Sequence, residues 1–328
     1  TDGTTFSFQL NKATGRMENY KYGEEVLIEQ GPVPNYWRAI LPNDQYCDDH
    51  MRTLCESIRA QKIEVSQETG LTTITIPLDF GEGDYKSQMK QTMTYTIRSD
   101  GSVTVSTTLD GRELPGYQKN GSGTIYRRYL RIGTNMVLPE GFENVQWYGN
   151  GPVETMLDRK SAARVGVYKS TATDLYYPYM SGGDTGTLTD VNWITVSGKD
   201  KTTALAIAAS TPIEAQALHY SMEQLSKYHP YEIEPDDKLY LSVNYASQGT
   251  GSASCSVDVL DKYTLPYDQT YSYSYTILPI TNTEAGSVMS ATLPYRTETE
   301  TASGDMFADD LSENNFDVTT KPETAQLI

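Results

Sequence analysis

WYGNGPVETMLDRKSAARVGVY, running from Trp147 to Tyr168, is the stretch that decides the fold. It places a Gly-x-Gly-Pro turn and an Asp-Arg-Lys triplet between two aromatic-rich segments that are predicted to be strands. We expect Gly149 and Gly151 to supply positive φ angles, and Pro152 to fix the turn and remove a backbone donor. The close spacing of three charged side chains behind the turn predicts a structural ion-pair cluster of Glu154, Asp158 and Arg159.

Alternation of apolar and polar residues recurs along the rest of the chain, as expected for half-buried β-strands. Residues 89–97 and 103–109 flank an Asp-Gly step, which is a strong hairpin signal. Helical signatures are confined to two segments, a Ser-x-x-Gln capping box from Ser221 to about Tyr228 and an apolar face over 48–59. The pattern predicts an all-β, antiparallel, sandwich-type fold with one or two short helices. Further strands are predicted at 6–10, 17–20, 72–76, 193–196, 204–208, 240–245 and 270–277.

Composition excludes several classes of partner. The net charge is −17, and phosphate binding needs clustered Lys and Arg, so we expect neither nucleic acid nor anionic membrane surfaces as partners. No apolar run approaches the roughly 20 residues of a membrane span, so membrane insertion is not expected. The 25 Tyr residues, against 6 Phe and 3 Trp, favour β-structure with half-wet surfaces.

Three cysteines are too few for a disulfide framework. Cys47 and Cys55 flank His50, but a second close Cys or His pair is missing, so we expect no metal site, and we expect no other cofactor. The cysteine content does not decide the compartment. The alternatives are the cytoplasm of a bacterium and a secreted or cell-surface location, and the extracellular location is favoured. Because the chain begins at Thr1 without Met, we expect an excised domain or a processed fragment.

The quoted stretch resembles the G-x-G-P-x-E-x-Y-x-D-R-K segment in the C-terminal small-chain domain (domain 5) of glycoside hydrolase family 2 β-galactosidases. Met156 stands in place of its Tyr, and Pro42 replaces an Asp in the segment YWRAILPND, which resembles the family's F-W-R-A-P-T-D-N-D. Further matches lie in order at 176–193 and 218–263. The resemblance implies a large antiparallel supersandwich, similar in fold to galactose mutarotase, over residues 1–280. Residues 281–328 are expected to form an acidic, Thr- and Glu-rich extended tail or linker.

The catalytic glutamates of that family lie on a (β/α)₈ barrel, which needs about 250 residues of alternating strand and helix. Nothing in this sequence has that pattern, and retaining hydrolysis requires two carboxyl groups about 5–5.5 Å apart. We therefore predict no catalytic residues and a non-catalytic domain of a β-galactosidase-like hydrolase. The expected partners are the catalytic barrel, which the domain would support, and a galactose-containing carbohydrate, whose site it would shape.

The resemblance also implies a carbohydrate-binding set at the mouth of the active site. A family Trp or Cys that follows a Gly-rich segment corresponds to Cys255, whose role is either to shape the site or to be a buried, inert thiol. Asn43 and Asp44 either grip sugar hydroxyls or form an Asx-turn with their own backbone. Polar residues of the family pattern are replaced at Asn244 and Ala246. The full candidate set is Trp37, Arg38, Asn43, Asp44, Asp184, Ser254 and Cys255.

Two other functions stay open. One is an independent carbohydrate-binding module on the same scaffold, which would present Trp and Tyr side chains in an open groove. The other is a mutarotase-like epimerase, which needs a positioned His together with a Glu. We interpret His219 and His229 as structural, because they flank the short helix predicted after Ser221.

Overall fold

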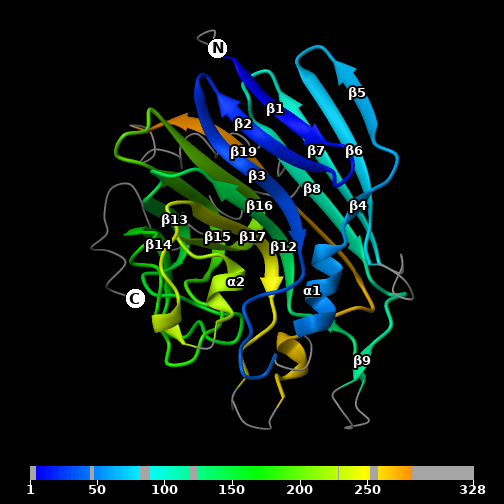
Figure 1. The fold of residues 1–328 in the computed structure, drawn as a ribbon, viewed down its shortest axis with the longest axis vertical. Coiled ribbons are helices and arrows are strands. Elements are labelled where there is room, and N and C mark those ends of the chain that lie inside the picture. Colours follow the sequence, from blue (N-terminus) through cyan, green and yellow to red (C-terminus); the bar gives the residue numbers. More distant parts are fainter. Residues whose placement is uncertain are drawn as a thin grey trace, which may run out of the picture.

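The fold is built almost entirely from antiparallel strands (Figure 1). The computed structural model describes residues 5–44, 48–81, 89–118, 125–227, 229–251 and 258–282. Within these ranges it contains two short α-helices, so the predicted all-β antiparallel class with one or two helices is confirmed. Residues 283–328 of the expected acidic tail, together with Cys47, Ser254 and Cys255, lie outside the described residues.

The described elements have the following bounds. The helices are α1 (Asp48–Glu56) and α2 (Met222–Leu225). The strands are β1 (Phe6–Asn11), β2 (Arg16–Tyr22), β3 (Glu25–Asn35), β4 (Arg59–Ala60), β5 (Glu64–Glu68), β6 (Leu71–Asp79), β7 (Lys90–Arg98), β8 (Val103–Asp110), β9 (Tyr117–Gln118), β10 (Ile125–Tyr126), β11 (Arg128–Tyr129), β12 (Arg131–Leu138), β13 (Asn144–Gly151), β14 (Arg164–Thr171), β15 (Leu188–Ser197), β16 (Thr203–Leu218), β17 (Leu239–Ser247), β18 (Leu265–Pro266) and β19 (Thr270–Thr281).

A single large sheet contains fifteen of the described strands, in the order β1-β2-β3-β12-β17-β16-β19-β8-β7-β6-β4 with side branches. The sheet changes partner along β16, which pairs with β19 over 203–209 and with β17 over 214–218. Between these halves lies Pro212, which is exposed and has no backbone N–H to give to a ladder. β15 pairs with β16 along both halves and leads on to β13 and β14.

The stretch from Trp147 to Tyr168 forms the β13–β14 hairpin, in which its first and last residues lie directly opposite each other. The expectation of positive φ at Gly149 and Gly151 is wrong, since both continue β13. Glycine is needed there for close approach. A Cβ on Gly149 would lie 2.8 Å from the Cα of Val191, and one on Gly151 would lie 2.5 Å from the ring of Tyr168.

Both predicted helices are present, and both are shorter than expected. The Ser221 side chain accepts from the N–H of Gln224 (3.2 Å) and the Gln224 side chain accepts from the Ser221 N–H (2.7 Å), so the capping box is complete. α2 nevertheless ends at Leu225. α1 ends at Glu56 and not at Arg59, because Arg59 begins β4 and pairs with β6.

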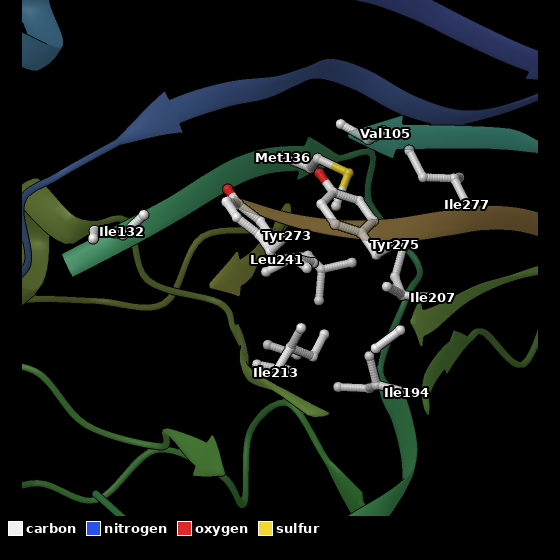
Figure 2. Packing of buried hydrophobic residues seen from close by; sticks show 14 of the residues in the cluster. Val105, Ile132, Met136, Ile194, Ile207, Ile213, Leu241, Tyr273, Tyr275 and Ile277 are labelled. Atoms are coloured by element: carbon white, nitrogen blue, oxygen red, sulfur yellow. The ribbon is translucent and has the colours of Figure 1, made fainter. Parts of the chain in front are cut away.

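The largest hydrophobic cluster of the described residues is rich in tyrosine, and a smaller one, which contains Tyr148 and Trp193, is separate from it. Figure 2 shows Tyr273 and Tyr275 of β19 beside Met136 and Leu241, with Ile213 of β16 across from them. Several tyrosines are fully buried, which departs from the half-wet surfaces expected from composition. The set comprises Tyr20, Tyr36, Tyr95, Tyr129, Tyr267 and Tyr275. Burial raises the pKa of tyrosine hydroxyls in this core, for example those of Tyr95 and Tyr275.

The opposite face of β3, β12, β17 and β16 carries a buried row of polar side chains, here called the polar layer. Period-2 alternation places Ile213, Ala215 and Ala217 in the core, so the residues between them face the other way. The strand register then places residues of these four strands next to one another in two rows. The polar layer consists of Asn35, Asn135, Glu214, Gln216, Ser242 and Asn244.

Candidate functional site

One cavity collects residues from four of the sequence motifs and is here called the loop cavity. Its volume is about 430 Å³. Of the predicted site residues, Asn43 and Asp184 line it, and Arg159 joins them from the quoted hairpin. The remaining lining residues are Leu41, Pro42, Met156, Tyr179, Met180, Ser181, Gly182, Gly183, Thr250 and Gly251.

Asp158 holds one wall of the loop cavity. Its carboxylate accepts from the backbone N–H groups of Thr250 (2.9 Å) and Gly251 (2.8 Å), and from the Thr250 hydroxyl (3.1 Å). Burial alone would raise the pKa of Asp158, but these donors outweigh it and the pKa is lowered. Asn43 Nδ2 donates to the carbonyl of Thr250 from the other side, at 2.7 Å. The backbone of residues 250–251 is therefore held by two side chains that are distant in sequence.

Behind this wall lies a buried ion pair between Arg38 and Asp44, both with 0 % of their side-chain surface exposed. The Arg38 Nε to Asp44 Oδ2 distance is 2.8 Å, and the guanidinium also donates to the carbonyls of Gln248 and Gly249. Asp44 accepts from the backbone N–H of Leu41 (3.1 Å). Burial disfavours the charged form of Arg38, yet the adjacent carboxylate raises its pKa. Asp44 thus binds its own loop, as the Asx-type alternative expected, and neither member of the pair faces the cavity.

Asp184 joins the loop cavity to the polar layer. Its carboxylate accepts from Arg131 Nη2 (2.7 Å) and from Gln216 Nε2 (3.0 Å). Arg131 is fully buried and its Nε also donates to the hydroxyl of Ser247 (3.0 Å). The charge of Asp184 is therefore neutralised within the protein, and its position is fixed by β12, β16 and β17 together.

The expected ion-pair cluster is only partly present. Glu154 pairs with Arg159, and both contact the hydroxyl of Tyr179. Asp158 is not in that cluster, because its oxygens are occupied by the Thr250 and Gly251 donors. The Arg159 side chain is 51 % exposed, so the guanidinium lies at the mouth of the loop cavity.

Trp37 lies elsewhere. Its ring is buried, lines a separate groove beside α1, and is covered by the Arg52 guanidinium at 5.1 Å from the ring centroid. Trp37 therefore does not contribute to the loop cavity. The neighbouring Cys55 is a free thiol, and burial raises its pKa to about 12, so it is not a reactive nucleophile at neutral pH.

Several charged and polar residues of this region carry no recognisable sequence motif. They are Arg131, Glu214, Gln216 and Gln248. Glu214 is the most perturbed, because burial raises its pKa to about 7, against the opposing effects of Ser247 and Arg131. One signal for Glu214 and Gln216 is present in the sequence. In the segment IEAQAL polar residues alternate with apolar ones, which indicates that the polar residues share one face of a strand.

Neither a metal centre nor a membrane helix is found in the described part of the chain. No three or more His, Cys, Asp or Glu side chains in these ranges are grouped as metal ligands. No helix among the described residues is both long and apolar enough to cross a bilayer.

Solved structures that align with this chain include proteins described as galactose mutarotase-like or galactose mutarotase related. A galactose mutarotase-like protein from Lactobacillus casei aligns with 85 % of this chain and 100 % of its own, at 10 % identity and a TM-score of 0.40. A galactose mutarotase related enzyme from Lactobacillus acidophilus covers 85 % and 98 %, at 10 % identity and a TM-score of 0.45. These values are too low to carry any functional inference.

Sequence relatives are closer. A β-galactosidase of Priestia megaterium is 28 % identical over 286 residues, or 85 % of this chain and 26 % of its own length. A β-galactosidase of Halalkalibacterium halodurans is 27 % identical over 84 % of this chain and 27 % of its own length. The chain thus spans about a quarter of these relatives. The family model described as "Beta galactosidase small chain" matches residues 2–277, which is well over half of the sequence, and the protein therefore belongs to the β-galactosidase small chain family.

Proposed function

We propose that this chain is the non-catalytic C-terminal domain of a family 2 β-galactosidase-like glycoside hydrolase, where it supports the catalytic barrel and shapes the galactoside site. The observation that carries this proposal is the convergence of several side chains on one short backbone segment. Side chains from two separate motifs, Arg38 and Asn43 from one and Asp158 from the other, all bind the backbone of residues 248–251.

Such a concentration of bonds on four residues exceeds what a simple connection between strands requires. Asp158 alone binds three donors, and hydrogen bonds to charged groups each contribute about 1.5–3 kcal/mol. Backbone fixed in this way gives the loop cavity a wall of constant shape, which lowers the entropic cost of positioning a substrate. We further assign Ser254 and Cys255, which come later in the same sequence motif, to the galactoside site on the basis of the family resemblance alone.

The surface around the loop cavity is suited to contact with another protein domain such as the catalytic barrel. Met180 is 95 % exposed, and Tyr179, which also lines the cavity, is 43 % exposed. Large apolar side chains gathered at a cavity rim are typical of surfaces that another protein covers. We assign this face to contact with the catalytic barrel.

The loop cavity does not have the groups that glycoside hydrolysis requires. Among its described lining residues, Asp184 is the only carboxylate, and Arg131 neutralises it. Retaining hydrolysis needs a second carboxyl group about 5–5.5 Å away. The chain alone is therefore expected to give no turnover of nitrophenyl β-galactoside above a heat-denatured control. Turnover at enzymatic rates would refute the non-catalytic assignment.

A positive test uses the enzyme that contains this chain. Replacing Asp158 by Asn keeps its shape but weakens its hold on Thr250 and Gly251. We expect KM for the galactoside to rise several-fold, because the wall of the loop cavity is then less firmly fixed. Arg112→Ala is the matched control, because that exposed side chain pairs with the adjacent Asp110, away from the loop cavity. Equal kinetics in the Asp158→Asn and Arg112→Ala enzymes would contradict the positioning role.

An independent carbohydrate-binding module is the second candidate. It is favoured by the size of the loop cavity, about 430 Å³, which falls in the range of small-molecule sites. Calorimetric titration of the chain with galactose, at galactose concentrations up to hundreds of millimolar, separates the two. Saturable binding that is lost in Asn43→Ala would favour the module.

A mutarotase-like epimerase has less support. His219 bonds with both ring nitrogens, to Glu143 at 2.7 Å and to the carbonyl of Lys238 at 2.8 Å. It lines neither the loop cavity nor the groove beside α1. Its contacts fit a structural role, and we do not propose epimerase activity.

A further inference from the structure

A second hollow lies on the other side of the polar layer and is here called the sheet groove. It has a volume of about 240 Å³, and its lining residues come chiefly from α1, α2, β3, β12 and β17. Its lining residues include Val33, Asn35, Trp37, Arg52, Glu56, Asn135, Val137, Gln216, Tyr220, Met222, Glu223, Tyr240 and Ser242.

Three N–H donors converge on the sulfur atom of a methionine that lines this groove; Asn35 and Asn135 also line it, and Arg131 lies behind it. The Sδ of Met222 lies 3.6 Å from Asn35 Nδ2, 3.7 Å from Asn135 Nδ2 and 3.9 Å from Arg131 Nη1. Asn35 and Arg131 have only 2 % and 0 % of their surface exposed. The three donors come from β3 and β12, so the sheet itself fixes their arrangement.

A thioether is a poor partner for these donors, because its sulfur is a weak acceptor. Asn35 Nδ2 also donates to the carbonyl of Trp37 at 2.6 Å, so one of its two N–H groups already has an oxygen partner and the other is directed at the sulfur. N–H groups in a buried environment are normally satisfied by oxygen, and the remaining N–H groups here have only the sulfur as a protein acceptor among the described residues. Met222 is also easily moved. It is half-buried, is the first residue of the four-residue helix α2, and has three rotatable side-chain bonds.

We propose that the sheet groove is a binding site for one neutral monosaccharide ring, whose hydroxyl oxygens replace the Met222 sulfur on the three donors. This inference does not depend on the role proposed above. The ring would pack its apolar C–H face against Val33 and Val137, which are half-buried and flank the donors. The volume is below the 300–1,000 Å³ of larger ligand sites, which favours one ring over an oligosaccharide.

Charge favours a neutral ligand over an anion. Arg131 is the one charged group among the three donors, and Asp184 already pairs with it. At the rim, Arg52 pairs with Glu56, which leaves Glu223 as an exposed negative charge. An anionic ligand would therefore meet a net negative rim, whereas a sugar hydroxyl needs only the amide and guanidinium N–H groups.

The sheet groove and the loop cavity are separate but share a wall. Gln216 lines the groove, and its amide donates to Asp184, which lines the cavity. The two sites can thus be distinguished by methionines, since Met222 lies only in the groove and Met180 only in the cavity.

The test is titration of the full 328-residue chain with D-galactose and with D-glucose, followed by saturation-transfer NMR and calorimetry. Met222→Ala is expected to bind at least one of these sugars about three- to tenfold more tightly, because it removes the competing side chain. Met222→Phe fills the groove without offering an acceptor and should abolish binding. Asn135→Ala should weaken binding about three- to tenfold, the loss of one hydrogen bond. Met180→Ala is the matched control and should leave the affinity unchanged.

Three results would overturn the proposal. One is the absence of any sugar signal in Met222→Ala, which is judged folded by its circular dichroism spectrum. Another is binding that responds to Met180→Ala and not to the Met222 variants, which would place the sugar in the loop cavity. The third is tighter binding of galacturonate than of galactose, which would assign the donors to an anion.

Discussion

Removal of Asp44 tests the buried pair that supports the loop cavity. Asp44→Ala leaves the Arg38 guanidinium buried with only the carbonyls of Gln248 and Gly249 as acceptors. Both side chains are fully buried, so water cannot take over the role of the carboxylate without opening the fold. The variant therefore measures the free-energy cost of an uncompensated buried cation.

The magnitude follows from the groups that the Asp44 carboxylate binds. Breaking a buried ion pair by removing one partner costs about 3–5 kcal/mol. Asp44 also accepts from the Leu41 N–H and from Gln248 Nε2, although Gln248 keeps its own backbone hydrogen bond. Domains are stable by only about 5–15 kcal/mol, so Asp44→Ala is expected to remove a large fraction of the free energy of unfolding. Asp44→Asn, which keeps the acceptor oxygen but not the charge, should fall between Asp44→Ala and the wild type.

Urea unfolding, followed by circular dichroism and by tryptophan fluorescence, gives the required free energies if the two probes report the same transition. Glu56→Ala is the matched control. Its partner Arg52 and Glu56 itself are 40 % and 69 % exposed, and exposed pairs contribute about 0–1 kcal/mol. Destabilisation by Asp44→Ala of less than about 1 kcal/mol, or no more than in Glu56→Ala, would refute the argument that this pair is desolvated.

Two further predictions concern the same region. Burial raises the pKa of Glu214 to about 7, above its value in an unfolded chain, so the native state alone holds this proton between about pH 4.5 and 7. The free energy of unfolding should therefore fall as the pH rises through this window. In Glu214→Gln the fall should be smaller, by about 1.4 kcal/mol for each unit by which the pKa of Glu214 is raised. Identical pH profiles of the wild type and the variant would exclude this assignment. A Cβ on Gly182 would lie 1.7 Å from the carbonyl oxygen of Lys227, so Gly182→Ala should destabilise the protein by about 1–3 kcal/mol in urea unfolding. Ser181→Ala, at the exposed neighbouring position, should have no such effect, and an unchanged midpoint for both would count against the close approach.

Local patterns were sufficient for most of the secondary structure. The Asp100-Gly101 step predicted the β7–β8 hairpin, and Gly101 has the positive φ that this turn needs. The capping box at Ser221 likewise predicted α2. The prediction for the glycines in β13 was wrong, because glycine is required both where another strand packs closely and where a turn has positive φ. The sequence alone does not distinguish these two causes.

The candidate site was harder to predict, because its contacts join residues far apart in the chain. Arg38 and Asp158 meet near residues 248–251, which follow them in the sequence by 210 and 92 positions, through ladders that no local pattern specifies. Trp37 and Asn43 are close neighbours in the sequence, yet they line different hollows. Arg131 carries no motif, and its role appears only when β12, β17 and the Asp184 loop are brought together.

The two buried arginines explain why polar groups persist where apolar ones would be more stable. Replacement of a buried ion pair by packed hydrophobic residues is often neutral or stabilising, so stability alone does not account for Arg38 or Arg131. A guanidinium, however, presents five N–H groups in a rigid fork and can fix several loops at once. Arg38 joins its own loop to the carbonyls of Gln248 and Gly249, and Arg131 joins β17 to Asp184. Methionine could fill either space but could not define where those backbones lie, and it is the position of the loops that a sugar site at this edge would require.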